Sequence, residues 1–365
     1  MASLSAEERT ALRDAVTRLL ADRSTEADVR RTMETARGYD EALWAQLAEM
    51  GVAGLVIEEA YGGAGAGPLE LEAVMEAAGA SLLCAPLLGS SVLAAALLQG
   101  LDDDEAKARL LPGLAGGTLI AAAALTGEAG SWSPEGVAVS ASADGALSGH
   151  ASYVIHGQNA GVLLVLAHAP DGLAAFEVAA DAAGVSVAAL PTFDHTLRLA
   201  RITFDGARGR RLQGQAWPAA QAALDLALVA LAGDQAGGAQ RCLEFTVDYA
   251  KTRFQFGRAI GSFQAIKHMA ADLLLESESA ISAARNAAAK LADAAPDAEA
   301  AVALAAFACA DAYAKTTADA VQMHGGIAFT WEHPAHLYLR RARSGAQLFG
   351  ASNLHRERFL KALGA

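Results

Sequence analysis

The chain has 365 residues, 53% of them hydrophobic, and carries 28 basic against 41 acidic side chains, for a formal net charge of −13. A chain of this length is too long for one simple core, so we expect two or three packed units. The negative charge disfavours phosphate backbones and argues against nucleic acid as a partner, and no apolar run looks long and unbroken enough to span a membrane.

The spacing of apolar residues changes twice along the chain. Residues 6–117 have apolar positions spaced by three and four, which predicts helices. Residues 118–214 break into strand-length apolar segments bounded by glycine turns, which predicts a β unit with hairpins. From residue 216 onward, alanine- and leucine-rich tracts predict three helices of about 30 residues or more and a shorter pair. This order predicts an α+β protein with a helical domain (1–117), a β-barrel or sandwich domain (118–214) and a helical bundle (215–365).

The cysteines and the N-terminus indicate the cellular setting, whereas a glycine run is similar to a motif that it does not complete. Cys84, Cys242 and Cys309 lie far apart in apolar stretches, and the polar N-terminus has no signal-peptide core, so we expect reduced thiols in a cytoplasmic protein. The glycine run at 62–67 is similar to a dinucleotide-binding loop. Pro68 takes the place of its last glycine, and a surface turn is the better interpretation.

The most informative motifs are RFQFGRAIGSFQAIKHMAAD (Arg253 to Asp272) and QMHGGIAFTWEHP (Gln322 to Pro334). An Arg and a Gln at the end of a long helix can bind a pyrophosphate, and paired glycines let a second backbone approach it closely. Together they resemble the paired signature of the acyl-CoA dehydrogenase family, and the resemblance implies FAD and a C-terminal four-helix bundle. The Thr330–His333 run further resembles subunits of α2β2 acyl-CoA dehydrogenases that act on steroid side chains or ring fragments.

The resemblance assigns cofactor contacts residue by residue. Its first set, implied to hold the FAD pyrophosphate and adenosine, is Arg253, Gln255, Phe256 and nearby Gln264. Its second set, implied to reach the FAD of a neighbouring subunit, is Gln322, Gly325 and Gly326. Taken alone, the arginine would neutralise a helix C-terminus and the glycine pair would cap a helix. His324, Glu332 and His333 are expected to pack, cap or pair structurally.

The β unit matches the family less closely. Thr126 and Ser131 match positions that face the flavin ring and thioester, whereas Tyr153 and Ile155 stand where the family has Trp and Thr. Tyr153 either stacks on the isoalloxazine or is an ordinary aromatic in a strand.

The implied reaction needs a carboxylate base, because the α-proton of the thioester is removed while the β-hydrogen leaves as hydride. The two positions where the family places this Glu are here Phe349 and Ala227. Asp234, two helical turns beyond Ala227, is a candidate catalytic base or else a buried acid bonded to a neighbouring helix.

Two functions remain open. The first is a flavoenzyme subunit that oxidises an acyl-CoA to the 2,3-enoyl-CoA and passes electrons to an electron-transfer flavoprotein. The second is a non-catalytic subunit that completes the FAD site and interface of a homologous chain. The implied assembly is α2β2 or a homo-oligomer, and an acyl-CoA oxidase is a minor alternative.

Overall fold

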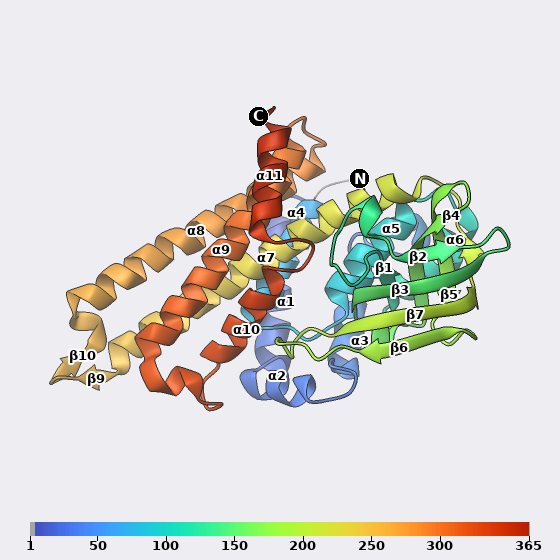
Figure 1. The fold of residues 1–365 in the computed structure, drawn as a ribbon. Coiled ribbons are helices and arrows are strands. Elements are labelled where there is room, and N and C mark those ends of the chain that lie inside the picture. The colour runs from blue at the N-terminus through green and yellow to red at the C-terminus, as the bar shows by residue number, and fades with distance from the viewer. Residues whose placement is uncertain (1–3, 365) are drawn as a thin grey trace. The chain divides into compact units, whose positions relative to one another are not determined.

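The computed structural model describes residues 4–364. Helices occupy the N-terminal third, strands the middle and helices the remainder, which confirms the predicted α+β class (Figure 1). The N-terminal helices are α1 (Ala6–Arg23), α2 (Glu26–Met33), α3 (Glu41–Glu49), α4 (Pro68–Ala80), α5 (Ala95–Gln99) and α6 (Asp104–Ala115). The C-terminal helices are α7 (Ala216–Thr252), α8 (Gln264–Ala292), α9 (Ala298–His324), α10 (Ala335–Gly345) and α11 (Ser352–Ala362).

Every strand-length segment expected between residues 118 and 214 coincides with a strand. These strands are β1 (Ala121–Ala124), β2 (Val139–Ala141), β3 (Ala146–Ile155), β4 (Val162–Ala169), β5 (Gly172–Ala179), β6 (Val185–Ala189) and β7 (Leu199–Arg208). The short strand β8 (Arg210–Arg211) was not expected. The glycine-bounded apolar runs were therefore reliable indicators of strands here.

By contacts, the residues form two compact units. Among residues 4–364, unit 1 comprises residue 4 and residues 32–67 and 84–227. It holds one sheet in the order β6-β7-β3-β2-β4-β5-β8, with β1 parallel to β4. Neighbouring strands are otherwise mainly antiparallel, and small and branched apolar side chains such as Val165 and Ile202 fill the core. A π-helix (Leu87–Ala94) packs against β1 and β3 in the same unit.

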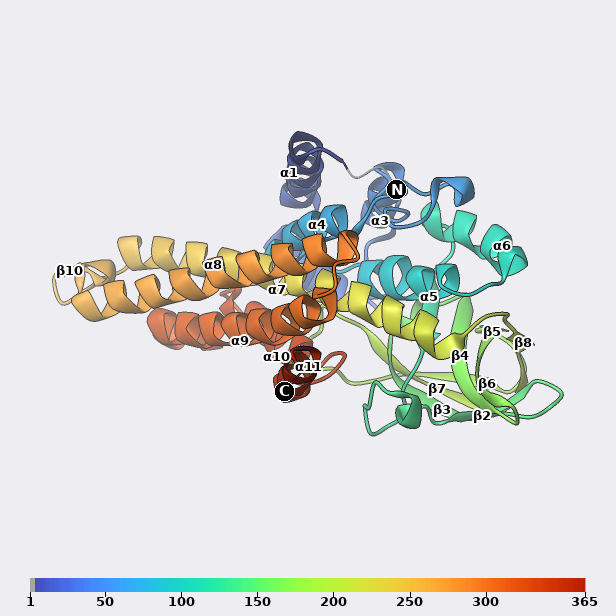
Figure 2. The same ribbon diagram turned by 90° about the horizontal axis from the view of Figure 1, so that it is seen from above.

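Unit 2 comprises residues 5–31, 68–83 and 228–364. Within it, α8 and α9 run side by side along the second half of α7 (Figure 2), and α4 crosses α7 at very short range. A Cβ at Gly79 would collide with the Asp234 carbonyl, and one at Gly237 would collide with the Glu76 carbonyl. Glycine on both helices therefore permits this crossing, which no local sequence pattern predicts.

Helix α7 differs from one sequence expectation. By length and composition alone it passes as a membrane-spanning helix, although no apolar run was expected to do so. Its most apolar window is 67% buried inside the protein, as in a core helix. The alanine-rich composition of α7 is therefore explained by packing against its neighbours.

Candidate cofactor-binding site

Arg253 directly follows the last turn of α7 and begins an exposed hairpin. The strands β9 (Phe254–Gln255) and β10 (Arg258–Ala259) pair antiparallel across Phe256 and Gly257. Both turn residues have positive φ, as a tight hairpin of this kind requires, and the Phe256 side chain is 91% exposed. Among residues 4–364, the Arg253 guanidinium has neither a hydrogen bond nor an ion pair, so it is available to an anion.

The second predicted contact lies at the end of α9. Gln322 is exposed on its last turn, and the glycine pair that follows is also exposed. Gly325 adopts φ 66° and ψ −143°, a conformation nearly restricted to glycine, and no atom of the described chain lies within 4 Å of a Cβ built on Gly325 or Gly326. The backbone at this turn is therefore open to close approach by a ligand.

Both contacts lie at the same end of the bundle in unit 2 (Figure 1, near the β9–β10 hairpin). Ala250 of α7, Ile266 of α8 and Met323 of α9 pack in one apolar cluster beneath them. Gln264 is the first residue of α8, and its amide nitrogen lies 3.5 Å from His268 Nε2. The structure thus brings together the residues that the two motifs assign to the cofactor.

In unit 1, the residues predicted to face the flavin ring are bonded or packed against neighbouring residues of the same unit. The Thr126 hydroxyl is buried and donates to the Ser131 carbonyl at 2.6 Å. Tyr153 adopts φ 57° at an irregularity in the β3–β7 pairing, and its hydroxyl donates to the Glu128 carbonyl at 3.1 Å. Ile155 is 2% exposed, and the π-helix residue Gly89 passes so closely that a Cβ there would lie 2.9 Å from the Ile155 side chain.

The three positions considered for a catalytic base lack a free carboxylate. Ala227 and Phe349 are both buried, and Phe349 has a positive φ of 63°. Asp234 is 3% exposed and forms a bidentate pair with Arg341, whose Nη2 donates to Oδ1 at 2.6 Å and whose Nε donates to Oδ2 at 3.1 Å. Because both oxygens accept from the guanidinium, the pair matches a buried acid bonded to a neighbouring helix.

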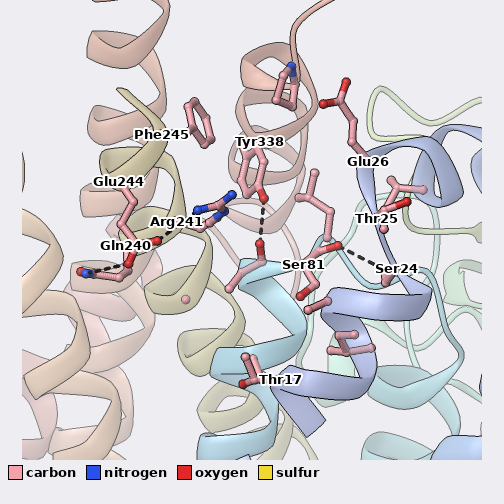
Figure 3. Close-up of a pocket in the computed structure, with 18 of the residues that line it drawn as sticks. Thr17, Ser24, Thr25, Glu26, Ser81, Gln240, Arg241, Glu244, Phe245 and Tyr338 are labelled. Carbon is pink, nitrogen blue, oxygen red and sulfur yellow. Dashed lines mark hydrogen bonds and ion pairs between the residues drawn. The ribbon is translucent and has the colours of Figure 1, made fainter. Parts of the chain in front are cut away.

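A cleft of about 620 Å³ in unit 2 was not expected from the sequence. It lies among α1, α2, α4, α7 and α10 (Figure 3), and its charged groups pair with one another, as Arg241 does with Glu244 at 3.3 Å. Tyr338 on its wall donates to the Ala80 carbonyl at 2.7 Å. Because its lining comes from helices far apart in sequence, no motif could have indicated it.

The residues present fit one end of FAD better than the other. An unpaired exposed guanidinium and an open glycine turn suit a pyrophosphate, which accepts hydrogen bonds and carries negative charge. Among the residues predicted to face the ring, the Thr126 and Tyr153 hydroxyls donate to carbonyls of the loop between β1 and β2, and the side chain of Ile155 has no hydrogen-bonding group.

Comparison with known proteins identifies the family of this chain. Residues 6–118 match the model of the acyl-CoA dehydrogenase N-terminal domain, and residues 214–364 match that of the C-terminal domain. The chain is 37% identical to acyl-CoA dehydrogenase IpdE2 of Mycobacterium tuberculosis over 94% of this chain and 93% of that protein.

Two solved assemblies are also similar to this chain. A chain of the ChsE4-ChsE5 complex from Mycobacterium tuberculosis superimposes with a TM-score of 0.90 at 30% identity, covering 100% of this chain and 99% of that one. A chain of the Tcur3481-Tcur3483 steroid ACAD, solved as a variant, gives a TM-score of 0.87 at 30% identity, covering 98% of each chain. With both domain models matched and a relative aligned over nearly its whole length, the chain belongs to the acyl-CoA dehydrogenase family, a family of flavin-dependent oxidoreductases.

Proposed function

We propose that this chain is one half of a heteromeric acyl-CoA dehydrogenase and supplies cofactor contacts to a site whose base comes from a homologous chain. The assembly would convert an acyl-CoA thioester to the 2,3-enoyl-CoA. The α-proton passes to a carboxylate, and the β-hydrogen leaves with its electron pair. FAD, when bound, accepts that hydride, and its electrons pass on to an electron-transfer flavoprotein.

The contrast between two sets of predicted cofactor residues, one in each unit, carries this proposal. In unit 2 the Arg253 guanidinium has no partner among residues 4–364 and the Gly325 backbone is open, so this set can bind a diphosphate. In unit 1 the hydroxyls of Thr126 and Tyr153 already donate to carbonyls of the loop between β1 and β2. A chain built to hold the phosphates but not the reactive ring fits a supporting subunit.

The exposed aromatic residues around Arg253 support a protein partner. Phe254, Phe256, Phe329 and Trp331 are all more than half exposed at this end of unit 2. Exposed aromatic side chains gathered near one site are typical of interfaces. The similarity to chains of the ChsE4-ChsE5 and Tcur3481-Tcur3483 assemblies supports a homologous acyl-CoA dehydrogenase chain as that partner. We further propose an α2β2 arrangement in the cytoplasm.

The substrate class follows from the same relatives. We infer a CoA thioester of a steroid side chain or ring fragment, because one similar structure is named a steroid ACAD.

A second candidate keeps the whole reaction in this chain, with Asp234 as the base of a homo-oligomer. Its position in an apolar helical tract favours that role, since a buried acid in such a tract needs a partner or a function. The bidentate pair with Arg341 opposes it, since neither oxygen is free to approach a substrate proton.

The two candidates differ in flavin content. We would purify this chain alone and again after co-expression with a homologous dehydrogenase chain encoded nearby, and then measure FAD per chain and anaerobic bleaching by acyl-CoA. The proposal expects flavin and bleaching only in the mixed assembly. A homo-oligomer that holds one FAD per chain and is bleached by an acyl-CoA would overturn it in favour of the second candidate.

A further inference from the structure

The two cofactor motifs are joined by a side-chain stack that neither motif requires. Tyr249 lies one turn before Arg253, and its carbonyl accepts from the Arg253 amide at 2.8 Å. Its ring stacks on His324 with centroids 4.4 Å apart and an interplanar angle of 27°. Its hydroxyl also donates, at 3.4 Å, to the His324 carbonyl, which belongs to the peptide that leads into Gly325. Tyr249 therefore links the two turns, through its backbone carbonyl to Arg253 and through its ring and hydroxyl to His324.

The hydrogen bonds fix which nitrogen of His324 carries its proton. Nδ1 lies 2.8 Å from the Ala320 carbonyl, and because a carbonyl can only accept, Nδ1 must carry the proton. Nε2 is buried and has no hydrogen-bond partner within the described chain. A second proton on this ring would thus be placed where no acceptor is available.

The surroundings of His324 also oppose a positive charge. Its ring packs against His333 at 4.3 Å between centroids and against Phe245 at 5.6 Å. His333 Nδ1 accepts from the Ala335 amide, so its proton sits on the other nitrogen. The charged and titratable groups that face this stack are Tyr249 of α7, His333, His336 and Arg340 from the loop and α10, and Glu26 and Arg30 of α2.

We propose that Tyr249 and His324 are positioning residues that fix the Gly325–Gly326 turn in place relative to Arg253. This arrangement requires a neutral His324. The inference rests on the proposed role of both turns in binding FAD. Neither residue needs to touch the cofactor: Tyr249 acts through the His324 peptide and the last turn of α7.

The pH dependence has a definite sign. Burial lowers the pKa of His324 from its ordinary 6.5, more than the bond to Ala320 raises it, and burial lowers the pKa of His333 to about 4. A lowered histidine pKa means that the folded form favours the neutral ring. The arrangement of the two turns is therefore present above the ordinary histidine pKa, and it is lost as the pH falls through the lowered pKa of His324.

The test uses the co-expressed assembly after removal of FAD, with FAD itself as the probe. Tyr249→Phe keeps the stack but removes the hydroxyl, and should raise the Kd for FAD by about fivefold at neutral pH. His324→Leu keeps the packing but cannot titrate. The wild type should lose FAD affinity roughly tenfold as the pH is lowered from neutrality through the lowered pKa of His324, and this variant should not. Tyr61→Phe and His195→Leu, in unit 1, serve as matched controls and should change neither quantity.

Two further readouts separate this inference from other causes. Unfolding of the FAD-free variants reports whether a loss of affinity is only a loss of stability, and NMR titration of the FAD-free wild type reports His324 directly. Wild-type affinity in Tyr249→Phe, an unchanged pH dependence in His324→Leu, or a His324 ring that titrates at its ordinary pKa would overturn the inference. If Arg253→Ala still weakens FAD binding, the proposed function survives that result. If Arg253→Ala binds FAD like the wild type, the cofactor assignment itself fails.

Discussion

Asp234 and Arg341 form a bidentate ion pair inside unit 2, between residues 107 positions apart in the chain. The side chains are 4% and 13% exposed, and the guanidinium also donates to the Leu83 carbonyl at 3.3 Å. The pair therefore links α7, α10 and the end of the segment that follows α4. It joins the helix that ends just before Arg253 to the helix that follows the glycine turn.

Removing one partner of this pair should be costly. Asp234→Ala leaves a buried guanidinium uncompensated, so we expect it to lower the free energy of unfolding by about 3–5 kcal/mol. The double replacement Asp234→Leu with Arg341→Met should lose less than the two single changes added together, because no unpaired charge remains. Urea unfolding measures both, with the exposed Asp248→Asn on the same helix as the control. Additive losses would contradict the pairing.

Arg253 should hold FAD through charge. A charge-assisted bond from its guanidinium to a phosphate is worth about 1.5–3 kcal/mol, so Arg253→Ala should weaken FAD retention by that amount. The helical circular-dichroism signal should be unchanged, because the side chain bonds to no other described residue. Arg31→Ala, a surface change, serves as the control. Flavin content equal to that of the wild type in the purified variant would end this assignment.

Gly326 offers a test that separates cofactor binding from folding. A Cβ there has no described neighbour within 4 Å, so Gly326→Ala should change the unfolding free energy by less than about 0.5 kcal/mol. If the backbone approaches a pyrophosphate, the added methyl should displace it and weaken FAD binding about tenfold. Sedimentation with flavin detection adds a second check, because the monomer should be flavin-free. Normal FAD affinity in this variant, or a flavin-loaded monomer, would contradict the contact.

The sequence predicted the elements well because their signals are local. Alternation in runs such as GVLLVLAH and helical spacing in the tract from Ala216 each arise within one element. The first motif is local in the same sense, because the β9–β10 hairpin joins the end of α7 to the start of α8 and keeps Arg253 near Gln264. The position of the second motif, at the end of α9, depends on packing between helices.

The rest depends on contacts between distant segments. Nothing near Asp234 indicates Arg341, although an acid in an apolar tract signals that a partner exists. The His324 stack was predicted only as packing, because its role depends on Tyr249, 75 positions earlier. Likewise, the positive φ of Tyr153 arises from an irregularity in strand pairing, which alternation cannot indicate.

Glu72 should make stability depend on pH. Its side chain is buried on α4, and its Oε1 lacks a hydrogen-bond partner among residues 4–364. Burial, and to a smaller extent the charge of Glu76, raise its pKa from 4.5 to about 7, although the charges of Arg285 and Arg13 oppose this shift. Between these values the folded form binds more protons, so stability should fall as the pH rises from 4.5 through about 7. Glu72→Gln should flatten this slope and, near pH 8, stabilise by roughly 2–3 kcal/mol. Urea unfolding across this range checks it, with exposed Glu49→Gln as the control, and a slope equal to that of the wild type would refute it.

The last prediction decides where the catalytic base resides. Asp234→Asn keeps the size of the side chain but removes the proton acceptor, so a catalytic Asp234 would give anaerobic flavin bleaching slower by at least ~10²-fold with FAD still bound. Because both its oxygens accept from Arg341, we expect bleaching in the mixed assembly to persist at close to the wild-type rate, provided that the variant is compared at a temperature where it stays folded. Replacing the partner chain's catalytic Glu by Gln should abolish bleaching in the same assembly. Loss of bleaching in Asp234→Asn, with FAD content and fold intact, would instead place the base in this chain. Full activity of an isolated homo-oligomer carrying Asp234→Asn would exclude both locations.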